Sequence, residues 1–483
     1  MKTTKLFLSI SVLALSLTLG VAKGQVGVPF RVVNKSTFPQ AWGIDTHLNG
    51  LQILSRPLPG EPFSLFDFTF TSPINENSEN FKLLLDVFPG YKVSNRNISE
   101  VDKLIAHTGQ SQAESWSHHA MPLDYGGIAF RYLAQVSQEN LKWKDLFHEY
   151  EKHPPEFLIE NGDIRTLSPI EKYEYLVGNT NFSITQFEWL EGNKYFEKFG
   201  HIPHWIGLCH GTAPATLNSP RPINAISLKS YDGKHDILFY PSDIKELVSY
   251  AWGNNANESA MIGVRCGSVV YYGQRPSLDC LDPNPGSFHL AVLNLMGLNA
   301  QTFIVDTSAG NEVWNRSIKS YRFKYFKPGT HNFTDKLEYA ITSIDDYKND
   351  PFAKYRSSRT ASIVGVWMEL SYIIGTRPSN SLVDSAERDL LGTHSLWYDI
   401  EIDPEGNIIG GEWQNEHHPD FLWVVGDNVK PRSIYDFIIG NNLNAYDGTT
   451  SLPPMITSYA KKAALKNQLL FSVLERMLEL SRK

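Results

Sequence analysis

The spacing of apolar and polar residues divides the chain into three kinds of segment. Residues 25–165 mix short apolar runs with polar linkers, and within them 139–152 predicts a helix that Pro154 ends. From 167 to 426 aromatic and β-branched residues predict strands, interrupted by a helix over 242–252 with Ser242 and Asp243 as caps. Apolar positions at helical spacing over 456–482 predict a single amphipathic helix.

The first residues have the pattern of a cleaved export signal. Lys2 and Lys5 precede an apolar stretch over 6–21, and the small residues near Ala22 or Gly24 form a cleavage site of the kind that signal peptidases recognise. A membrane anchor is the alternative, but about 16 apolar residues are fewer than the roughly 20 that span a bilayer. We therefore expect a protein that is secreted, or periplasmic in a bacterium, and whose mature chain does not insert into a membrane.

These patterns predict an α+β protein with a mostly antiparallel sheet and four parts. The parts are a signal peptide (1–24), an N-terminal domain that could act as a prosegment (25–165), the core that carries the chemistry (166–430), and a linker with an amphipathic helix (431–483).

The net charge is −8, from 44 basic and 52 acidic residues, and no basic run is present. A nucleic-acid binder that tracks phosphates is thereby excluded.

Three cysteines are too few for a disulfide-built scaffold, and their odd number is informative in an exported protein. Cys266 and Cys280 are close enough in sequence to close a short loop, and we expect a disulfide between them. Cys209 then remains as a free thiol. It is either an inert buried thiol or a nucleophile that its chemistry keeps unpaired.

The residues around Cys209 favour a reactive thiol. Small residues follow it over 211–215, and Pro214 suggests that a helix begins near the cysteine. Amide groups at a helix start favour the thiolate and lower the pKa of a thiol. His210 is a poor base for Cys209, because consecutive side chains on a helix diverge.

A base could come from a predicted hairpin downstream. Residues 290–296 read as a strand, 297–300 as a turn and 301–305 as a returning strand. This pairing places His289 opposite Asp306, where the carboxylate could orient the imidazole. The alternative is a core histidine and a strand-end carboxylate, and a slip of one residue would separate the two side chains.

Several motifs occur in an order that resembles the transglutaminase elicitor family, secreted enzymes of plant-pathogenic oomycetes with relatives in marine bacteria. They are WIGLCHGTAPA (205–215), FYPSDIK (239–245), NPGSFH (284–289), FIVD (303–306), EVWNRSIKSY (312–321), GNIIGGEW (406–413) and HPDFLW (418–423). The resemblance implies a papain-like core and protein-glutamine γ-glutamyltransferase activity, with calcium dependence in some members. It makes Cys209 the nucleophile, His289 the base and Asp306 the residue that orients the base.

Two positions depart from the patterns that this resemblance implies. Papain-like enzymes carry a glutamine about six residues before the cysteine as oxyanion donor, and Pro203 stands there. The indole of Trp205, His204 or the backbone amide of Cys209 could replace it. Residues 316–317 read Arg-Ser where oomycete members typically carry Gln-Pro, in the peptide that plants perceive.

A transglutaminase forms a thioester between its cysteine and the substrate glutamine. This thioester needs protection from water, which aromatic side chains would supply. Trp314 is a candidate for substrate binding. Five tryptophans could shield the thioester from water: Trp205, Trp252, Trp314, Trp413 and Trp423. Each of them could instead be an ordinary core residue.

Metal signals are weak. The two histidines in 148–153 are five apart rather than four, and they diverge on a helix. Residues 401–412 roughly match a calcium loop, with Asp403, Glu405 and Glu412 as candidate ligands. Because 397–403 alternates like a strand, we favour a hairpin turn over 404–407.

The sequence thus predicts a secreted transglutaminase that joins glutamine and lysine side chains of protein substrates through a Cys-His-Asp thioester mechanism. No motif in the sequence calls for a cofactor, and calcium is suggested by the family resemblance alone. A cysteine peptidase or a glutamine deamidase would use the same residues, and a non-catalytic binding or host-perceived protein could keep the same fold.

Overall fold

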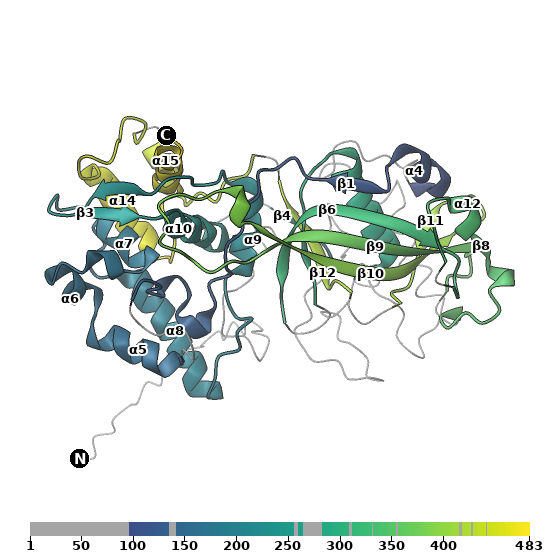
Figure 1. Cartoon of the computed structure of the whole chain (residues 1–483), viewed down its shortest axis with the longest axis horizontal. Helices are drawn as coiled ribbons and strands as arrows, with labels where there is room; N and C mark the ends of the chain where they lie inside the picture. Colours follow the sequence, from purple (N-terminus) through teal and green to yellow (C-terminus); the bar gives the residue numbers. More distant parts are fainter. Residues whose placement is uncertain are drawn as a thin grey trace, which may run out of the picture.

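The computed structural model describes residues 96–134, 142–255, 259–263, 283–308, 312–330, 332–353, 356–414, 418–426, 428–440 and 442–483. The molecule is elongated, with a mainly helical half and a half built on a long curved sheet (Figure 1). Helix α9 (Cys209–Asn218) lies where the two halves meet. The predicted signal peptide and residues 25–95 lie outside the described residues.

The helical half is assembled around α10 (Pro241–Asn254), in which every residue from Pro241 to Gly253 is buried. Asp243 caps this helix by accepting the backbone N–H of Tyr240 at 2.8 Å. The other helices of this half are α5 (Trp143–Lys152), α6 (Pro155–Glu160), α7 (Pro169–Val177), α8 (Ser183–Phe199), α13 (Asp436–Ile439), α14 (Pro454–Ala464) and α15 (Phe471–Ser481). Strands β2 (Ile226–Lys229) and β3 (Asp236–Phe239) form a separate ribbon beside them.

The predicted helices of this half have mixed outcomes. The helix expected over 139–152 is confirmed from Trp143 to Lys152 as α5, and the helix expected over 242–252 is confirmed within α10. The single helix expected over 456–482 is wrong, because α14 ends at Ala464 and α15 starts at Phe471. Asn467 lies between them with a φ of 53°, a left-handed backbone that a continuous helix does not contain.

The other half is a mixed arrangement of helices and antiparallel strands, which confirms the predicted α+β class. The main strand order is β11-β10-β9-β6-β5-β12-β4, and each of these neighbouring pairs is antiparallel. These strands are β4 (Ser259–Gly263), β5 (Ile304–Asp306), β6 (Asn315–Phe326), β9 (Ser362–Ile374), β10 (Leu390–Ile402), β11 (Ile408–Gly410) and β12 (Phe421–Val425). Three short strands extend the sheet: β1 (Thr108–Gln110), β7 (Phe333–Thr334) and β8 (Thr342–Ser343). The helices here are α4 (Ile98–Leu104), α11 (Pro285–Val292) and α12 (Leu337–Ala340).

The predicted hairpin between His289 and Asp306 is wrong. Residues 285–292 form α11, and a π-helical turn (Leu293–Leu298) continues it. Asn284 starts the helix, because its side chain accepts the backbone N–H of Gly286 and Pro285 stands at the first helical position. An apolar run of this length fits a buried helix as well as a buried strand, so its spacing could not decide between them.

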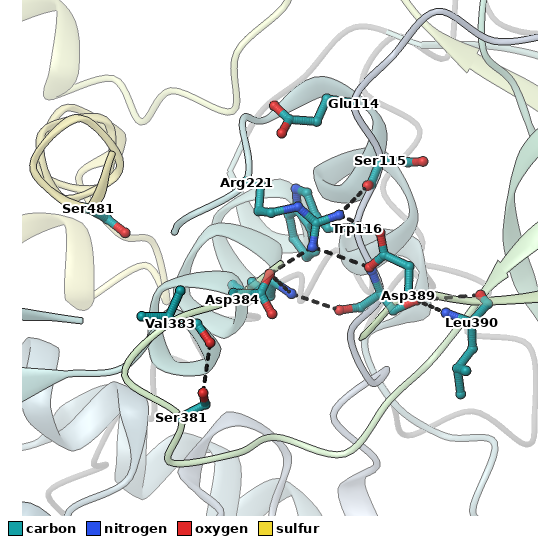
Figure 2. A network of polar contacts seen from close by, with 12 residues as sticks. Glu114, Ser115, Trp116, Arg221, Ser381, Val383, Asp384, Asp389, Leu390 and Ser481 are labelled. Carbon is teal, nitrogen blue, oxygen red and sulfur yellow. Dashed lines mark hydrogen bonds and ion pairs between the residues drawn. The ribbon is translucent and has the colours of Figure 1, made fainter. Parts of the chain in front are cut away.

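Residues 375–389, here called the strap, connect β9 to β10 and reach across to the helical half (Figure 1). Backbone bonds join the strap to residues 223–225, among them the N–H of Ala225 to the carbonyl of Leu382 at 2.7 Å. Figure 2 shows the buried guanidinium of Arg221 between the carboxylates of Asp384 and Asp389. Arg221 also donates to the carbonyl of Ser115 at 2.8 Å. The strap therefore ties the sheet to the helical half.

None of the helices in the described part of the chain is both long and apolar enough to cross a membrane.

Candidate active site

Cys209 is the first residue of α9, as the sequence predicted. The backbone N–H groups of Gly211 and Thr212 both reach the carbonyl of Leu208, which begins the helix. The N–H of Leu208 is in turn held by the carbonyl of Ala120 at 2.6 Å. The cysteine thus lies on a helix start that is fixed from a segment about ninety positions upstream in the sequence.

The small residues after Cys209 have a packing role. A Cβ atom at Gly211 would lie 2.3 Å from the carbonyl oxygen of Ser249 and 2.8 Å from the backbone nitrogen of Gly253. Only glycine therefore lets α9 approach α10 this closely. At Gly211 the small-residue run therefore serves the contact between two buried helices.

The sulfur of Cys209 lies against the first residues of β6 and the loop before them. Its S–H donates to the carbonyl of Val313 at 3.5 Å, and the side-chain amide of Asn315 donates to the sulfur at 3.4 Å. The indole N–H of Trp423 donates to the other end of that amide, Oδ1 of Asn315, at 2.8 Å. Cys209 is 9% exposed, so these contacts act in a largely dry environment.

The pKa of the Cys209 thiol is raised, contrary to the prediction from the helix start. Burial is the main cause, because it penalises the charged thiolate. Hydrogen bonds from the side chain and backbone of Asn315 lower the pKa, the negative charge of Asp306 raises it and the positive charge of Arg316 lowers it. The resting group is therefore a neutral thiol that depends on Asn315 and Arg316 for any stabilisation of its anion.

Asp306 lies near Cys209 at the end of β5, where it pairs with Asn315 of β6. Its Oδ1 accepts the backbone N–H of Trp314 at 2.8 Å and the N–H and hydroxyl of Ser308 at 3.2 and 3.1 Å. These bonds fix the two ends of the loop that precedes β6. The structure thus brings Asp306 close to the thiol, and it does so through β6 rather than through a hairpin with His289.

His289 lies in a different part of the sheet half. Its Nδ1 is 2.8 Å from the hydroxyl of Tyr398, and its ring packs at 5.2 Å from that of Phe323. Phe323 is eight residues from Asn315 along β6, about 26 Å at about 3.3 Å per residue. The structure therefore does not bring His289 to Cys209, and the three predicted catalytic side chains do not assemble into one triad.

The environment of His289 is that of a core histidine. Burial lowers its pKa to about 3, and the neighbouring His107 adds to this effect. The ring is fully buried and packs against aromatic side chains of β6 and β10. This arrangement corresponds to the alternative interpretation of this residue, a neutral imidazole packed in the core.

The three residues proposed as oxyanion or substrate-binding groups occupy different positions. His204 is exposed and pairs with Asp124 at 3.0 Å, and Trp205 is half-buried against the core. The indole N–H of Trp314 donates to Glu312 at 2.9 Å, and the guanidinium of Arg316 lies 5.1 Å from the ring centroid. Trp314 lies close to the thiol, because its backbone N–H is bonded to Asp306.

Asn315 is not among the site residues predicted from the sequence. It belongs to the segment 312–321, which resembles a peptide perceived by plants, and it contacts the sulfur of Cys209. Trp423 was counted only among the aromatic walls. Asn315 begins β6 and Trp423 lies in the middle of β12, and the spacing within either segment does not show that the two side chains meet.

The calcium candidates do not converge. The hairpin turn predicted over 404–407 lies between β10 and β11, and the N–H of Asp403 is bonded to the carbonyl of Asn407 at 3.0 Å. The carboxylate of Asp403 pairs with Arg359 at 3.0 Å, and Glu405 lies on the turn. Glu412 is buried beyond β11, where its backbone N–H is bonded to Asp399 at 3.0 Å. The turn therefore has a structural explanation without a cation.

His118, His119 and Glu246 form the other group with metal-ligand character among the described residues; their ligand atoms lie within 4.8 Å of one another. The N–H of Met121 donates to Nδ1 of His119 at 2.8 Å, which places the ring proton on Nε2. That Nε2–H donates to Glu246 at 2.9 Å. A nitrogen that carries a proton cannot also bind a metal, so this group is a hydrogen-bonded pair with a buried histidine beside it.

The predicted disulfide between Cys266 and Cys280 lies outside the described residues and stays a prediction. Within the part of the chain that the structure covers, Cys209 is a free, buried thiol.

Fold and site together define an α+β protein with a buried cysteine at the start of a helix that packs on an antiparallel sheet. The family model described as "Transglutaminase elicitor" matches residues 192–440, a range that contains α9, β5, β6 and β12. The chain belongs to the transglutaminase elicitor family.

Among solved structures, the chain is similar to the GP42 transglutaminase from Phytophthora sojae, at 19% sequence identity and a TM-score of 0.45, over 68% of this chain and 90% of that one. No curated protein sequence matches the chain.

Proposed function

We propose that this protein is a secreted protein-glutamine γ-glutamyltransferase in which Cys209 is the nucleophile. One observation carries the proposal: the sulfur of Cys209 stands at the start of a buried helix and receives an amide N–H from Asn315. Family membership supports the same class of enzyme. The substrates are proteins that present glutamine and lysine side chains.

The reaction has two steps that balance. The Cys209 sulfur attacks the carboxamide carbon of a glutamine, the C–N bond breaks, and the thiol proton leaves with ammonia. A neutral lysine amine then attacks the thioester, the C–S bond breaks, and an amine proton returns to sulfur. The products are an isopeptide bond, ammonia and the free thiol.

The proposed core is papain-like in its essential arrangement, a cysteine on a helix start that packs against an antiparallel sheet. Asp306 keeps a role in the proposal because it fixes the loop next to the thiol through Trp314 and Ser308. His289 has no part in it, because its hydrogen bond is to Tyr398, on the far part of the sheet.

The test uses purified mature protein, casein and a dansylated amine, with calcium supplied. Transfer predicts fluorescent casein with the wild type and none with Cys209→Ala. Ser472→Ala, on α15, serves as the control variant that should keep activity.

Other outcomes of the same assay identify the alternatives. Ammonia release without amine incorporation means a glutamine deamidase, and casein fragments mean a cysteine peptidase. If none of the three products forms, the proposal fails and a binding protein remains.

A further inference from the structure

Asn315 has a side-chain amide whose two ends are chemically different, and its surroundings select one orientation. The indole N–H of Trp423 can only donate, so it binds the oxygen end of the amide at 2.8 Å. The nitrogen end is then directed at the sulfur of Cys209, 3.4 Å away. With the amide reversed, two donors would face each other and the oxygen would face the sulfur, both inside the protein.

We propose that Trp423 and Asn315 act as a pair in the reaction of Cys209: Asn315 holds an N–H on the sulfur and on the developing oxyanion, and Trp423 fixes the orientation of that amide. This inference rests on the proposed function and adds two residues to it. Asn315 touches the reacting atom, and Trp423 is a positioning residue that acts through Asn315.

The sheet makes this arrangement rigid. Trp423 lies on β12 and pairs with Ile304 of β5, while Asn315 starts β6 and pairs with Asp306 of β5. The Trp423 indole therefore reaches across β5 to the amide. Asn315 and Trp423 are 6% and 3% exposed, so water does not compete for their hydrogen bonds.

The position of the amide suits an oxyanion as well as a thiolate. When the sulfur bonds to the carboxamide carbon, the negative oxygen develops one atom away from the sulfur. A donor that already contacts the sulfur needs only a small movement to reach this oxygen. Pro203 occupies the place where a papain-like enzyme carries its glutamine donor, and Asn315 supplies an equivalent amide from β6.

The thiol itself provides a test that does not depend on enzyme activity. Iodoacetamide alkylation of Cys209 is followed against pH by mass spectrometry of the peptide that contains it, in the full chain. Trp423→Phe removes the N–H and keeps most of the bulk, so the apparent pKa of Cys209 should rise and alkylation at pH 7 should slow by about threefold to tenfold.

Two further variants make the result decisive. Asn315→Asp keeps the shape but places a carboxylate against the sulfur, and it should raise the apparent pKa more than Trp423→Phe does. Trp116→Phe is the matched control, because the buried indole of Trp116 donates to the carbonyl of Ser219 at 3.0 Å and lies outside the site. Its thiol profile should equal that of the wild type.

The inference is overturned if folded Trp423→Phe and Asn315→Asp both keep the wild-type alkylation profile, or if Trp116→Phe changes it as much as they do. Amine incorporation is measured on the same samples. If the thiol profiles change as expected while even the wild type transfers no amine, the pair is supported and the proposed function fails. If the wild type transfers amine and the thiol profiles do not change, the proposed function is supported and the pair of Trp423 and Asn315 fails.

Discussion

The amide nitrogen of Asn315 lies 3.4 Å from the sulfur of Cys209, although the two residues are 106 positions apart in the chain. This contact joins the start of α9 to the start of β6, the two elements that meet where the helical and sheet halves join.

The first prediction concerns the pH dependence of Cys209. Because burial raises the pKa of its thiol, the thiolate is a small fraction at pH 7 and grows as the pH rises. Alkylation of Cys209 should therefore accelerate about tenfold per pH unit until the pH exceeds the ordinary pKa of a free thiol, about 8.5. Peptide mass spectrometry over pH 6 to about 10 measures this; a plateau below about pH 7 would mean a depressed thiol pKa instead.

The second prediction concerns His289 and acid stability. Its pKa falls from an ordinary value of about 6.5 to about 3 in the folded protein, so the unfolded chain binds the proton more readily. The resulting stabilisation is complete above about pH 6.5 and is lost as the pH falls toward 3, by about 5 kcal/mol. Urea unfolding at pH 7 and pH 4 should show less pH dependence in His289→Gln than in the wild type.

The same variant separates a core role from a catalytic one. His289→Gln should keep the alkylation profile of Cys209, because the imidazole contacts Tyr398 rather than the thiol. If the substitution shifts the apparent pKa of Cys209 while the protein stays folded, the separation of the two residues is contradicted.

The third prediction concerns the buried ion pairs of the strap. Arg221→Ala leaves the carboxylates of Asp384 and Asp389 without their guanidinium partner, as Figure 2 makes clear. Removing one partner of a buried pair typically costs about 3–5 kcal/mol. The free energy of unfolding in urea should fall by that order. Lys194→Ala breaks the exposed pair with Glu191 and should cost less than about 1 kcal/mol, and equal losses in the two variants would count against the strap's role.

The fourth prediction concerns the contact between α9 and α10. Gly211→Ala would place a Cβ atom 2.3 Å from the carbonyl oxygen of Ser249, so one of the helices must move. Overpacking of this kind costs about 1–3 kcal/mol. Thermal unfolding should show the loss, and the alkylation rate of Cys209 should change with it because α9 carries the thiol. A variant with wild-type stability would show that the helices are not in close contact.

Local signals in the sequence were sufficient for part of this structure. The helix start at Cys209 and the turn over 404–407 were predicted, because proline and glycine constrain the backbone within a few residues. The apolar run around His289 was assigned to a strand, because hydrophobicity alone does not separate a buried helix from a buried strand.

The candidate site depended on contacts that a single sequence does not contain. Asp306 was expected next to Cys209 and lies there, but its partner is Asn315 rather than His289. The bond between Trp423 and Asn315 joins two strands that are 108 residues apart in the chain. Strand order decides such pairs, and the spacing of residues within one segment gives no information about strand order.

The central claim, that Cys209 forms the acyl-enzyme, is tested most directly by trapping that intermediate. Wild-type protein is mixed with a glutamine-containing peptide in the absence of any acceptor amine, quenched in acid and analysed by intact mass and peptide mapping. The account predicts an adduct with the mass of the peptide less ammonia, attached to Cys209 and absent from Cys209→Ala. An adduct on another residue, or amine transfer that persists in Cys209→Ala, would contradict it.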